Sequence, residues 1–258
     1  MTRPGDAAHR DAIENSSDIG SSPELSETIG QIWVAPGRPE DVVADLRRTG
    51  GTSIRALAKI ATNESVALTT RSSAIWLLGR LKKLGPFKKT EALHPLLTVL
   101  VDPDESIRRE AALALGVLCD RRATGSLIQV MLGDPDTMVR QLAAHSLGNL
   151  GSSKAMRALR EVLTDQGQDS SLRGATAEAL GAYFAFDSAA ELISGLSDTS
   201  PEVRFWSAYA LGFMRIETAV PELERLASRD DAEVPGWWSV SKEAAWAIAE
   251  IRDNPPWR

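Results

Sequence analysis

One short pattern recurs five times along this chain and restricts the fold more than any other feature. An arginine is followed eight residues later by a glycine, and the segments read RSSAIWLLG, RREAALALG, RQLAAHSLG, RGATAEALG and RFWSAYALG. They begin at Arg71, Arg108, Arg140, Arg173 and Arg204 and end at Gly79, Gly116, Gly148, Gly181 and Gly212. A degenerate sixth copy, KEAAWAIAE, runs from Lys242 to Glu250. Successive glycines lie 37, 32, 33 and 31 residues apart, a period typical of stacked repeat units.

A second apolar stretch of helical period precedes each copy. In residues 92–101, for example, leucines recur with the spacing i, i+3, i+4 and i+7, which indicates one buried face of a helix. Asp-Pro at 102–103 and 134–135 separates the two stretches, as turn residues do. No β-type alternation continues beyond a few residues. Each unit is therefore predicted to be helix A, a turn and helix B. Because such a hairpin cannot bury its apolar stripe alone, the hairpins must stack.

The residue types inside the pattern indicate how the helices pack. The third and fourth residues after each arginine are mostly small, and the seventh is always leucine. Small side chains let neighbouring helices approach closely. A glycine inside a helix costs about 1 kcal/mol relative to alanine. Its recurrence therefore predicts either close backbone contact or helix termination at that position.

Three copies carry an aspartate six residues before the arginine: Asp102, Asp134 and Asp198. We predict that these aspartates cap helix B and pair with arginines of the same or the next unit. A cap without any ion pair is the alternative. Partly exposed pairs contribute only about 0.2–1 kcal/mol each, so we expect them to set the stacking register more than the stability.

Together these features resemble the HEAT repeat: proline in helix A (Pro95, Pro221), then aspartate, Val/Ile-Arg and Ala-Ala-x-Ala-Leu-Gly. The short period is similar to the bacterial subclass first noted in phycobilisome lyases. The resemblance covers roughly 52–252 and implies an all-α, right-handed α-solenoid of about six HEAT-like hairpins, with helices B lining a concave groove. The expected units are about 52–88, 89–120, 121–152, 153–185, 186–216 and 217–253. The first unit lacks the aspartate, the fourth replaces it with the loop 165–169, and the sixth lacks the glycine.

The residues one, five and nine positions after each arginine vary between copies. Because they are spaced by four, they form one stripe along helix B, here called the helix-B stripe. The candidate partner-binding residues are its members Trp76, Arg80, Arg109, Gln141, His145, Asn149, Glu178, Phe205, Tyr209 and Phe213, together with the neighbouring Trp206. Gln141, His145 and Asn149 form a polar strip.

The fifth unit carries an aromatic patch from Phe205 to Phe213, and aromatic residues are frequent anchors of interfaces. The alternative is that Phe205 and Phe213 pack against the next hairpin, beneath an insertion at 233–239. That insertion contains Trp237 and Trp238, and whether it caps the array or binds a partner stays open.

Charge is distributed unevenly within the net charge of −6: residues 1–38 carry −3, residues 39–90 carry +6 and residues 91–258 carry −9. Arg80, Lys82, Lys83, Lys88 and Lys89 form a basic cluster. Nucleic-acid binding through this segment is a third hypothesis, although the acidic remainder would repel a long duplex. We expect a disordered acidic tail over 1–38 and the solenoid over 39–258. Without a long apolar run or a signal segment, we expect a cytoplasmic protein that does not contact membranes.

No catalytic chemistry is predicted. Cys119 is the single cysteine and is expected to be buried filler, so no internal disulfide can form. No phosphate loop, nucleophile elbow or metal motif occurs, and His145 is not accompanied by the His-Glu pairs of deoxyhypusine hydroxylase. We therefore predict a non-enzymatic adaptor or scaffold, with no cofactor or metal, that binds a protein or peptide in the groove. The alternative is a lyase- or chaperone-like subunit that acts on a bilin protein. The oligomeric state is not specified by the sequence.

Overall fold

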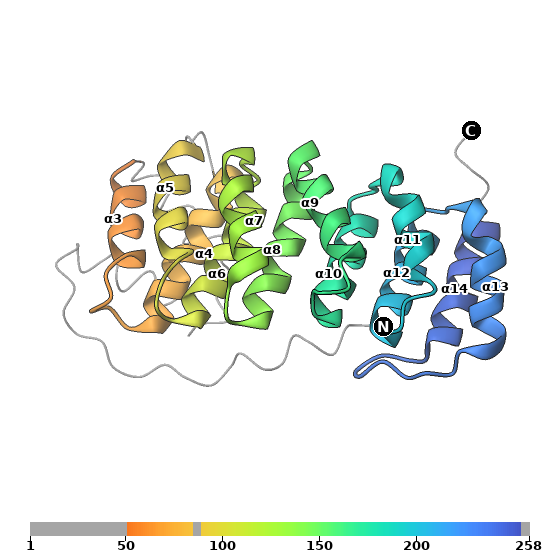
Figure 1. Ribbon diagram of the computed structural model, residues 1–258. Coiled ribbons are helices and arrows are strands. Elements are labelled where there is room, and N and C mark those ends of the chain that lie inside the picture. The colour runs from red at the N-terminus through yellow and green to blue at the C-terminus, as the bar shows by residue number, and fades with distance from the viewer. Residues whose placement is uncertain (1–50, 85–88, 254–258) are drawn as a thin grey trace, which may run out of the picture. The chain divides into compact units, whose positions relative to one another are not determined.

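The computed structural model describes residues 51–84 and 89–253, and this part of the chain consists of helices joined by short turns (Figure 1). The first helices of the six successive hairpins are α3 (Gly51–Ala61), α5 (Lys89–Val99), α7 (Thr124–Gly133), α9 (Ser153–Thr164), α11 (Ala189–Gly195) and α13 (Val220–Arg229). The second helices are α4 (Leu68–Leu84), α6 (Glu105–Leu118), α8 (Thr137–Leu150), α10 (Ser170–Ala182), α12 (Pro201–Phe213) and α14 (Val240–Asp253). The predicted all-α class is confirmed. The predicted tail over 1–38 lies outside the described residues.

Short 3-10 turns precede three of the first helices: η1 (Arg121–Ala123), η2 (Phe186–Ser188) and η3 (Glu217–Ala219). Among the described residues, the strand-type pairing is a single antiparallel bridge between Glu233 and Ser239. It closes the predicted insertion into a small loop, here called the Trp hairpin (residues 231–239). Gly236 adopts a left-handed backbone with φ of 80° at its tip, a conformation that glycine takes without strain.

The chain divides into two compact units, Met1–Ala114 and Leu115–Arg258, and each is described by itself. In the described part of the first unit, α3, α4 and α5 pack against one another. In the second unit, α8, α10, α12 and α14 pack side by side as one layer of second helices, and each also packs against the first helix of its own hairpin. The single array predicted over 39–258 stays a prediction.

The core of both units follows the repeat pattern. The leucine seven positions after each arginine is fully buried, as in Leu78, Leu147 and Leu211. The small residues at the third and fourth positions are buried as well. Burying a leucine contributes about 1.5–3 kcal/mol. The stripe that a lone hairpin would expose is thus covered by the next hairpin.

Close contact, not helix termination, explains the repeat glycines. A Cβ atom placed on Gly181 would lie 2.6 Å from the Cα of Ala210 on the next helix, and one on Gly79 would lie 2.8 Å from the Cα of Ala114. Such distances are below any normal contact, and the neighbouring atoms belong to backbone. α10 continues past Gly181 to Ala182. The helices approach so closely that only glycine fits.

These contacts also correct the register of the sixth copy. In the earlier copies, the glycine meets a residue six positions after the arginine of the next repeat, and Gly212 meets Ala247. Counting six residues back from Ala247 gives Ser241. Ser241 therefore occupies the arginine position, and the predicted start at Lys242 is wrong by one residue. Trp246 consequently stands at the fifth position of the repeat, on the helix-B stripe.

Four of the second helices, α6, α8, α10 and α12, share one way of ending. The residue eleven positions after the repeat arginine has positive φ at Cys119 (52°), Gly151 (56°), Phe184 (52°) and Arg215 (57°). A left-handed residue at this place reverses the chain after a helix. Cys119 is half-buried, not buried as predicted, and its thiol donates to the carbonyl oxygen of Asn149 at 3.2 Å.

Candidate functional site

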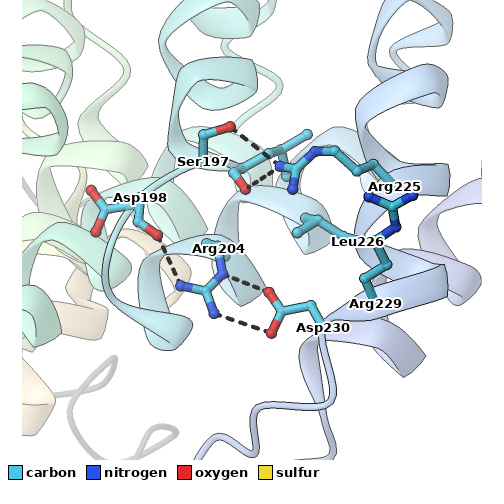
Figure 2. A pocket seen from close by; sticks show the side chains of 8 residues that line it. Ser197, Asp198, Arg204, Arg225, Leu226, Arg229 and Asp230 are labelled. Carbon is cyan, nitrogen blue, oxygen red and sulfur yellow. Dashed lines mark hydrogen bonds and ion pairs between the residues drawn. The ribbon is translucent and has the colours of Figure 1, made fainter.

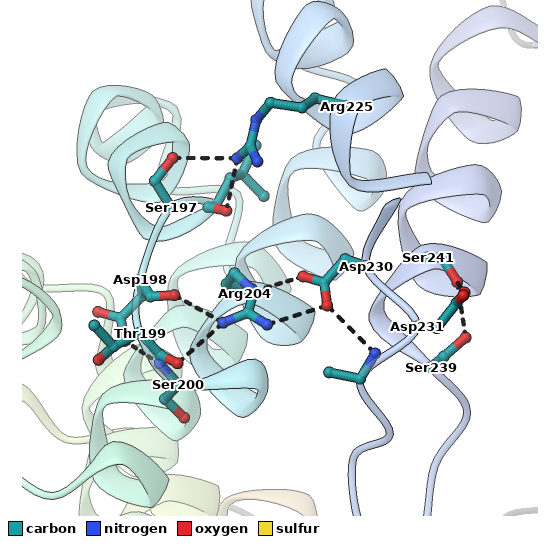
Figure 3. Close-up of polar contacts among 12 residues, drawn as sticks. Ser197, Asp198, Thr199, Ser200, Arg204, Arg225, Asp230, Asp231, Ser239 and Ser241 are labelled. Carbon is teal, nitrogen blue, oxygen red and sulfur yellow. Dashed lines mark hydrogen bonds and ion pairs between the residues drawn. The ribbon is translucent and has the colours of Figure 1, made fainter. Parts of the chain in front are cut away.

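The turns that join first to second helices carry a regular set of ion pairs, here called the arginine–aspartate ladder. In the second unit, Arg204 binds both carboxylate oxygens of Asp230, with its Nε 2.6 Å and its Nη2 3.1 Å away (Figure 3). Further pairs of the ladder include Arg71–Asp102, Arg140–Asp169 and Arg173–Asp198. In every one of these pairs the arginine reaches the aspartate of the following repeat. The predicted pairing with arginine is confirmed for Asp102 and Asp198, but the arginine belongs to the preceding repeat and not to the same or the next one.

The same arginines also bind their own turn. Arg204 Nη1 donates to the carbonyl oxygen of Asp198 at 2.8 Å, and Arg140 Nη1 donates to that of Asp134 at 2.9 Å. One guanidinium therefore ties two successive turns together. Its rigid fork of donors suits this task, because several hydrogen bonds form at fixed angles.

The predicted capping role of Asp102, Asp134 and Asp198 is wrong. The caps are two residues further on in α8, where Asp136 accepts from the backbone N–H of Val139 at 2.9 Å. The aspartate at the earlier position instead accepts the backbone N–H two residues ahead, as Asp198 does from Ser200 at 2.8 Å. It holds the turn while its other oxygen pairs with arginine. At α10 a single residue, Asp169, both caps the helix, by accepting from the backbone N–H of Leu172, and pairs with Arg140.

A pocket in the second unit lies on this ladder (Figure 2). Its lining residues are Leu196, Ser197, Asp198, Arg204, Arg225, Leu226, Arg229 and Asp230. Arg204 pairs with Asp230, and Arg225 binds Glu222 at 2.7 Å and the hydroxyl of Ser197 at 3.3 Å. The Arg204–Asp230 pair joins neighbouring turns, and Arg225 reaches from α13 to Ser197 in the preceding turn, so the pocket belongs to the structural ladder.

On the helix-B stripe of the first unit, Arg80 lies over the ring of Trp76, with its Cζ 3.8 Å from the ring centroid. Burial lowers the pKa of Arg80, and attraction by Glu110 on α6 partly opposes that shift. The cation thus stacks on an aromatic ring and is attracted by a carboxylate of the next helix pair. Arg109, also a candidate, is half-buried on α6. The side chains of Lys82, Lys83, Lys88 and Lys89 lie outside the described residues.

The predicted polar strip of the second unit lies along α8, where Gln141, His145 and Asn149 are all half-buried. His145 Nε2 lies 3.4 Å from Glu178 Oε2 on α10. The structure therefore brings together two candidates at the fifth repeat position of adjacent helices. This contact shows that the stripe continues from one helix to the next.

The predicted aromatic patch is part of a larger connected set of rings. Tyr209 lies nearly parallel to both Trp246 (5.9 Å between centroids, 8°) and Phe213 (5.9 Å, 12°). Phe213 contacts Phe184 at 5.1 Å, and Phe184 contacts Phe186 at 6.1 Å. Together with Trp237, these rings are here called the aromatic surface: Phe184, Phe186, Tyr209, Phe213, Trp237 and Trp246.

Two of the predicted aromatic candidates lie beneath this surface. Phe205 is only 1% exposed and Trp206 is buried. Trp237 covers both, with ring centroids 5.9 Å from Phe205 and 5.1 Å from Trp206. Phe205 therefore packs beneath the insertion, as the alternative to a binding role predicted, and is covered by the Trp hairpin. Phe213, in contrast, is exposed.

The Trp hairpin is attached to α14 through a buried carboxylate. Trp238 Nε1 donates to Glu243 Oε2 at 2.7 Å. Glu243 is 1% exposed, and its Oε1 makes no hydrogen bond. Burial raises the pKa of Glu243 to about 7, against the opposing effect of the hydrogen bond from Trp238. The carboxyl group therefore retains its proton far above the usual range.

The comparison with family models agrees with the geometry. The model for HEAT repeats matches residues 93–181 and 165–237, which together make up more than half of the chain. The chain is a HEAT-repeat protein. The repeated helical hairpins of the structure agree with this match. No curated protein sequence matches it.

Several solved structures share the fold of this HEAT-repeat protein. A chain in a structure of Kap95p with RanGDP is 14% identical, with a TM-score of 0.54 over 90% of this chain and 41% of that one. Importin beta is 13% identical, with a TM-score of 0.50 over 89% of this chain and 41% of that one. The present chain thus spans about two fifths of both. The CpcE–CpcF phycocyanin lyase of Nostoc sp. PCC7120 is 17% identical, with a TM-score of 0.46 over 94% and 99% of the two chains.

Two properties of the described residues bear on the earlier expectations. In residues 51–84 and 89–253, no group of three or more His, Cys, Asp or Glu side chains is arranged to hold a metal ion. No helix in the same ranges is long and apolar enough to cross a membrane.

Sequence reasoning missed several residues of this HEAT-repeat protein. Asp230 was missed because the Trp hairpin separates it from Ser241 by eleven residues instead of six. Trp246 was missed because the sixth copy was read one residue too late. Glu243 gave no signal, since a glutamate early in a helix normally faces solvent.

Proposed function

We propose that this HEAT-repeat protein is a non-catalytic adaptor that binds a protein partner through the aromatic surface of its second unit. The observation that carries the proposal is a set of rings, with Trp237 joined to the others through the buried Trp206, of which five are more than a third exposed. These are Phe184, Phe186, Phe213, Trp237 and Trp246. Large exposed apolar patches on a folded protein are typical of interaction sites, and aromatic residues supply most of the energetic anchors in interfaces.

The support beneath the aromatic surface fits this role. Tyr209, Phe213 and Trp246 stand on α12 and α14, which pack closely together. The buried Trp206 contacts Tyr209 edge-on at 5.5 Å between ring centroids and supports it from below. Because the rings are already ordered, binding would cost little side-chain entropy. Kap95p, which shares the fold, binds RanGDP, and this precedent supports a protein partner.

The test removes two rings without disturbing the core. A Tyr209→Ala/Trp246→Ala variant should bind its partner with at least about tenfold lower affinity. Each anchor residue of an interface contributes about 2 kcal/mol or more to binding. Affinity purification from the native host with quantitative mass spectrometry measures the loss. The matched control is Val101→Ala/Leu132→Ala, which removes comparably exposed apolar groups elsewhere. Circular dichroism and melting confirm that both variants fold. If both variants retain the same partners, the proposal is wrong.

A further inference from the structure

The first unit shows how a second helix of this chain holds a cation. Trp76 stands five positions after the repeat arginine, and Arg80 stands nine positions after it, four residues further along α4. The guanidinium lies over the ring at 3.8 Å, and Glu110 attracts it from α6. Ring, cation and carboxylate are thus supplied by the chain itself.

The second unit presents aromatic rings at the same fifth position of the repeat in α12 and α14, but it has no arginine at the ninth position of these helices. At the fifth position α12 carries Tyr209 and α14 carries Trp246, whose rings are nearly parallel. At the ninth position they carry Phe213 and Glu250. Where α4 has arginine, α14 therefore has a carboxylate four residues after its tryptophan.

The surroundings of these rings carry negative charge. Glu178 stands at the fifth position of α10, half-buried. Glu202 lies beside Gly174 and next to Trp206, since both side chains would meet a Cβ atom at Gly174, at 3.2 and 3.0 Å. Burial and the nearby Asp169 raise the pKa of Glu202. A positive ligand charge near these groups would relieve that electrostatic cost.

One lysine belongs to the same stripe. Lys242 stands one residue after Ser241, at the first position of the repeat, and four residues before Trp246. Its side chain is exposed. Its charge opposes that of an incoming cation. It therefore provides a substitution that should act in the opposite direction from the removal of a carboxylate.

We propose that the aromatic surface binds arginine or lysine side chains of a basic partner segment, with Trp246 and Tyr209 facing the cation and Glu250 supplying the opposite charge. This inference rests on the proposed function and names the chemistry of its partner. An arginine or lysine side chain can stack on any exposed aromatic face. A segment with several basic residues therefore suits a surface with several rings. The acidic residues would steer such a segment toward the surface.

The test uses the full chain and a labelled octapeptide of alternating arginine and glycine. A matched peptide with citrulline in place of arginine has the same shape without the charge. Fluorescence anisotropy should show the arginine peptide binding at least about tenfold more tightly than the citrulline peptide. Trp246→Leu and Glu250→Gln should each weaken binding about two- to fivefold, and Lys242→Gln should strengthen it about twofold. Trp246→Phe should restore part of the affinity, because the ring is retained.

The matched control for charge is Glu161→Gln, which removes one exposed carboxylate on α9, outside the stripe. It should leave the affinity within about twofold, since exposed charges at a distance are screened. Equal binding of the two peptides, absence of binding, or equal effects of Glu161→Gln and Glu250→Gln would each overturn the inference. If native partners are lost from Tyr209→Ala/Trp246→Ala while the two peptides bind alike, only the cation inference fails. If that variant keeps all partners, the proposed function itself fails.

Discussion

Asp198 and Glu243 are buried carboxylic acids of the same compact unit, one on the arginine–aspartate ladder and one beneath the Trp hairpin. The side chain of Asp198 is 4% exposed, and Glu243 is 1% exposed. Burial alone raises the pKa of Asp198, but hydrogen bonds from Arg173, Gln166 and Ser200 outweigh it and leave the pKa below its usual value. Within residues 51–84 and 89–253, the carboxyl group of Glu243 has Trp238 as its one hydrogen-bond partner, and its pKa rises to about 7.

The difference shows that partners, not depth, decide the charge of a buried acid. Asp198 is ionised because three hydrogen-bond donors face it, one of them the guanidinium of Arg173. Glu243 stays protonated below pH 7 because one indole N–H does not compensate for lost hydration. The ladder therefore joins repeats through fixed charges. The Trp hairpin closes the last repeat through apolar contacts and one acid whose charge follows pH.

The largest expected effect comes from removing the anion of the ladder. Asp198→Asn keeps the contact with the N–H of Ser200 but leaves the buried guanidinium of Arg173 without its counter-ion. Removing one partner of a buried pair costs about 3–5 kcal/mol. Urea unfolding of the full chain, followed by the fluorescence of the tryptophans in the second unit, measures this loss. A loss below about 1 kcal/mol would show that depth does not strengthen this pair.

The second largest expected effect is the dependence of stability on pH that Glu243 causes. Glu243 has a folded pKa of about 7 and an unfolded pKa near 4.3, so the folded state holds more protons between these values. Its contribution to stability is complete below about pH 4.3 and is lost as pH rises through 7, which amounts to about 2–4 kcal/mol.

Replacing this acid should remove the slope. Glu243→Gln retains an acceptor for Trp238 but does not titrate, so its unfolding free energy should change little between pH 4.5 and 7.5. Parallel urea titrations of both proteins across this range provide the measurement. Asp198, with its lowered pKa, acts in the opposite sense and only at lower pH. Equal slopes for wild type and variant would contradict the assignment.

A third substitution tests the close contact between α10 and α12 at Gly181. Gly181→Ala places a methyl group 2.6 Å from the backbone of Ala210, so α10 and α12 must move apart. Overpacking of this kind costs about 1–3 kcal/mol. Gly133→Ala is the control, because no atom lies within 4 Å of its Cβ position, and it should be neutral or stabilise by up to about 1 kcal/mol. Similar melting temperatures for the two variants would show that the close approach is not required.

The smallest effect sharpens the comparison within the ladder. Asp169 is 39% exposed in its pair with Arg140, and asparagine caps a helix as well as aspartate does. Asp169→Asn should therefore cost only about 0.2–1 kcal/mol. The same urea assay applies. A loss as large as that of Asp198→Asn would mean that exposure does not distinguish the two pairs.

Much of the fold was predictable because repetition reveals which positions are constant. The buried Leu147 and the pairing of Asp198 with an arginine followed from comparing copies, but the choice of the preceding repeat as its partner did not. The capping role was assigned to the wrong aspartate, because Asp134 and Asp136 both stand in the turn and only backbone geometry separates them. The register of the sixth copy was lost where the Trp hairpin interrupts the spacing.

For the candidate site, sequence reasoning found Tyr209 and Phe213 but not Trp246, Phe184 or Phe186. The latter two follow α10 in a turn, outside any periodic stripe, and reach Phe213 only through the fold. Phe205 was placed on the same stripe as Tyr209, yet Trp237 covers it. A spacing of four residues shows which residues share one face of a helix. It does not show whether a loop distant in sequence covers that face.

The sequence by itself determined the helical hairpin, its period and the contacts that repeat, because each copy must bury the same apolar stripe against a neighbour of the same kind. Only the tertiary structure decided the features that occur once: the acid buried beneath Trp238, the register of the last helix and the set of rings left exposed. Such features depend on contacts between segments that share no pattern, and a repeated local signal carries no information about them.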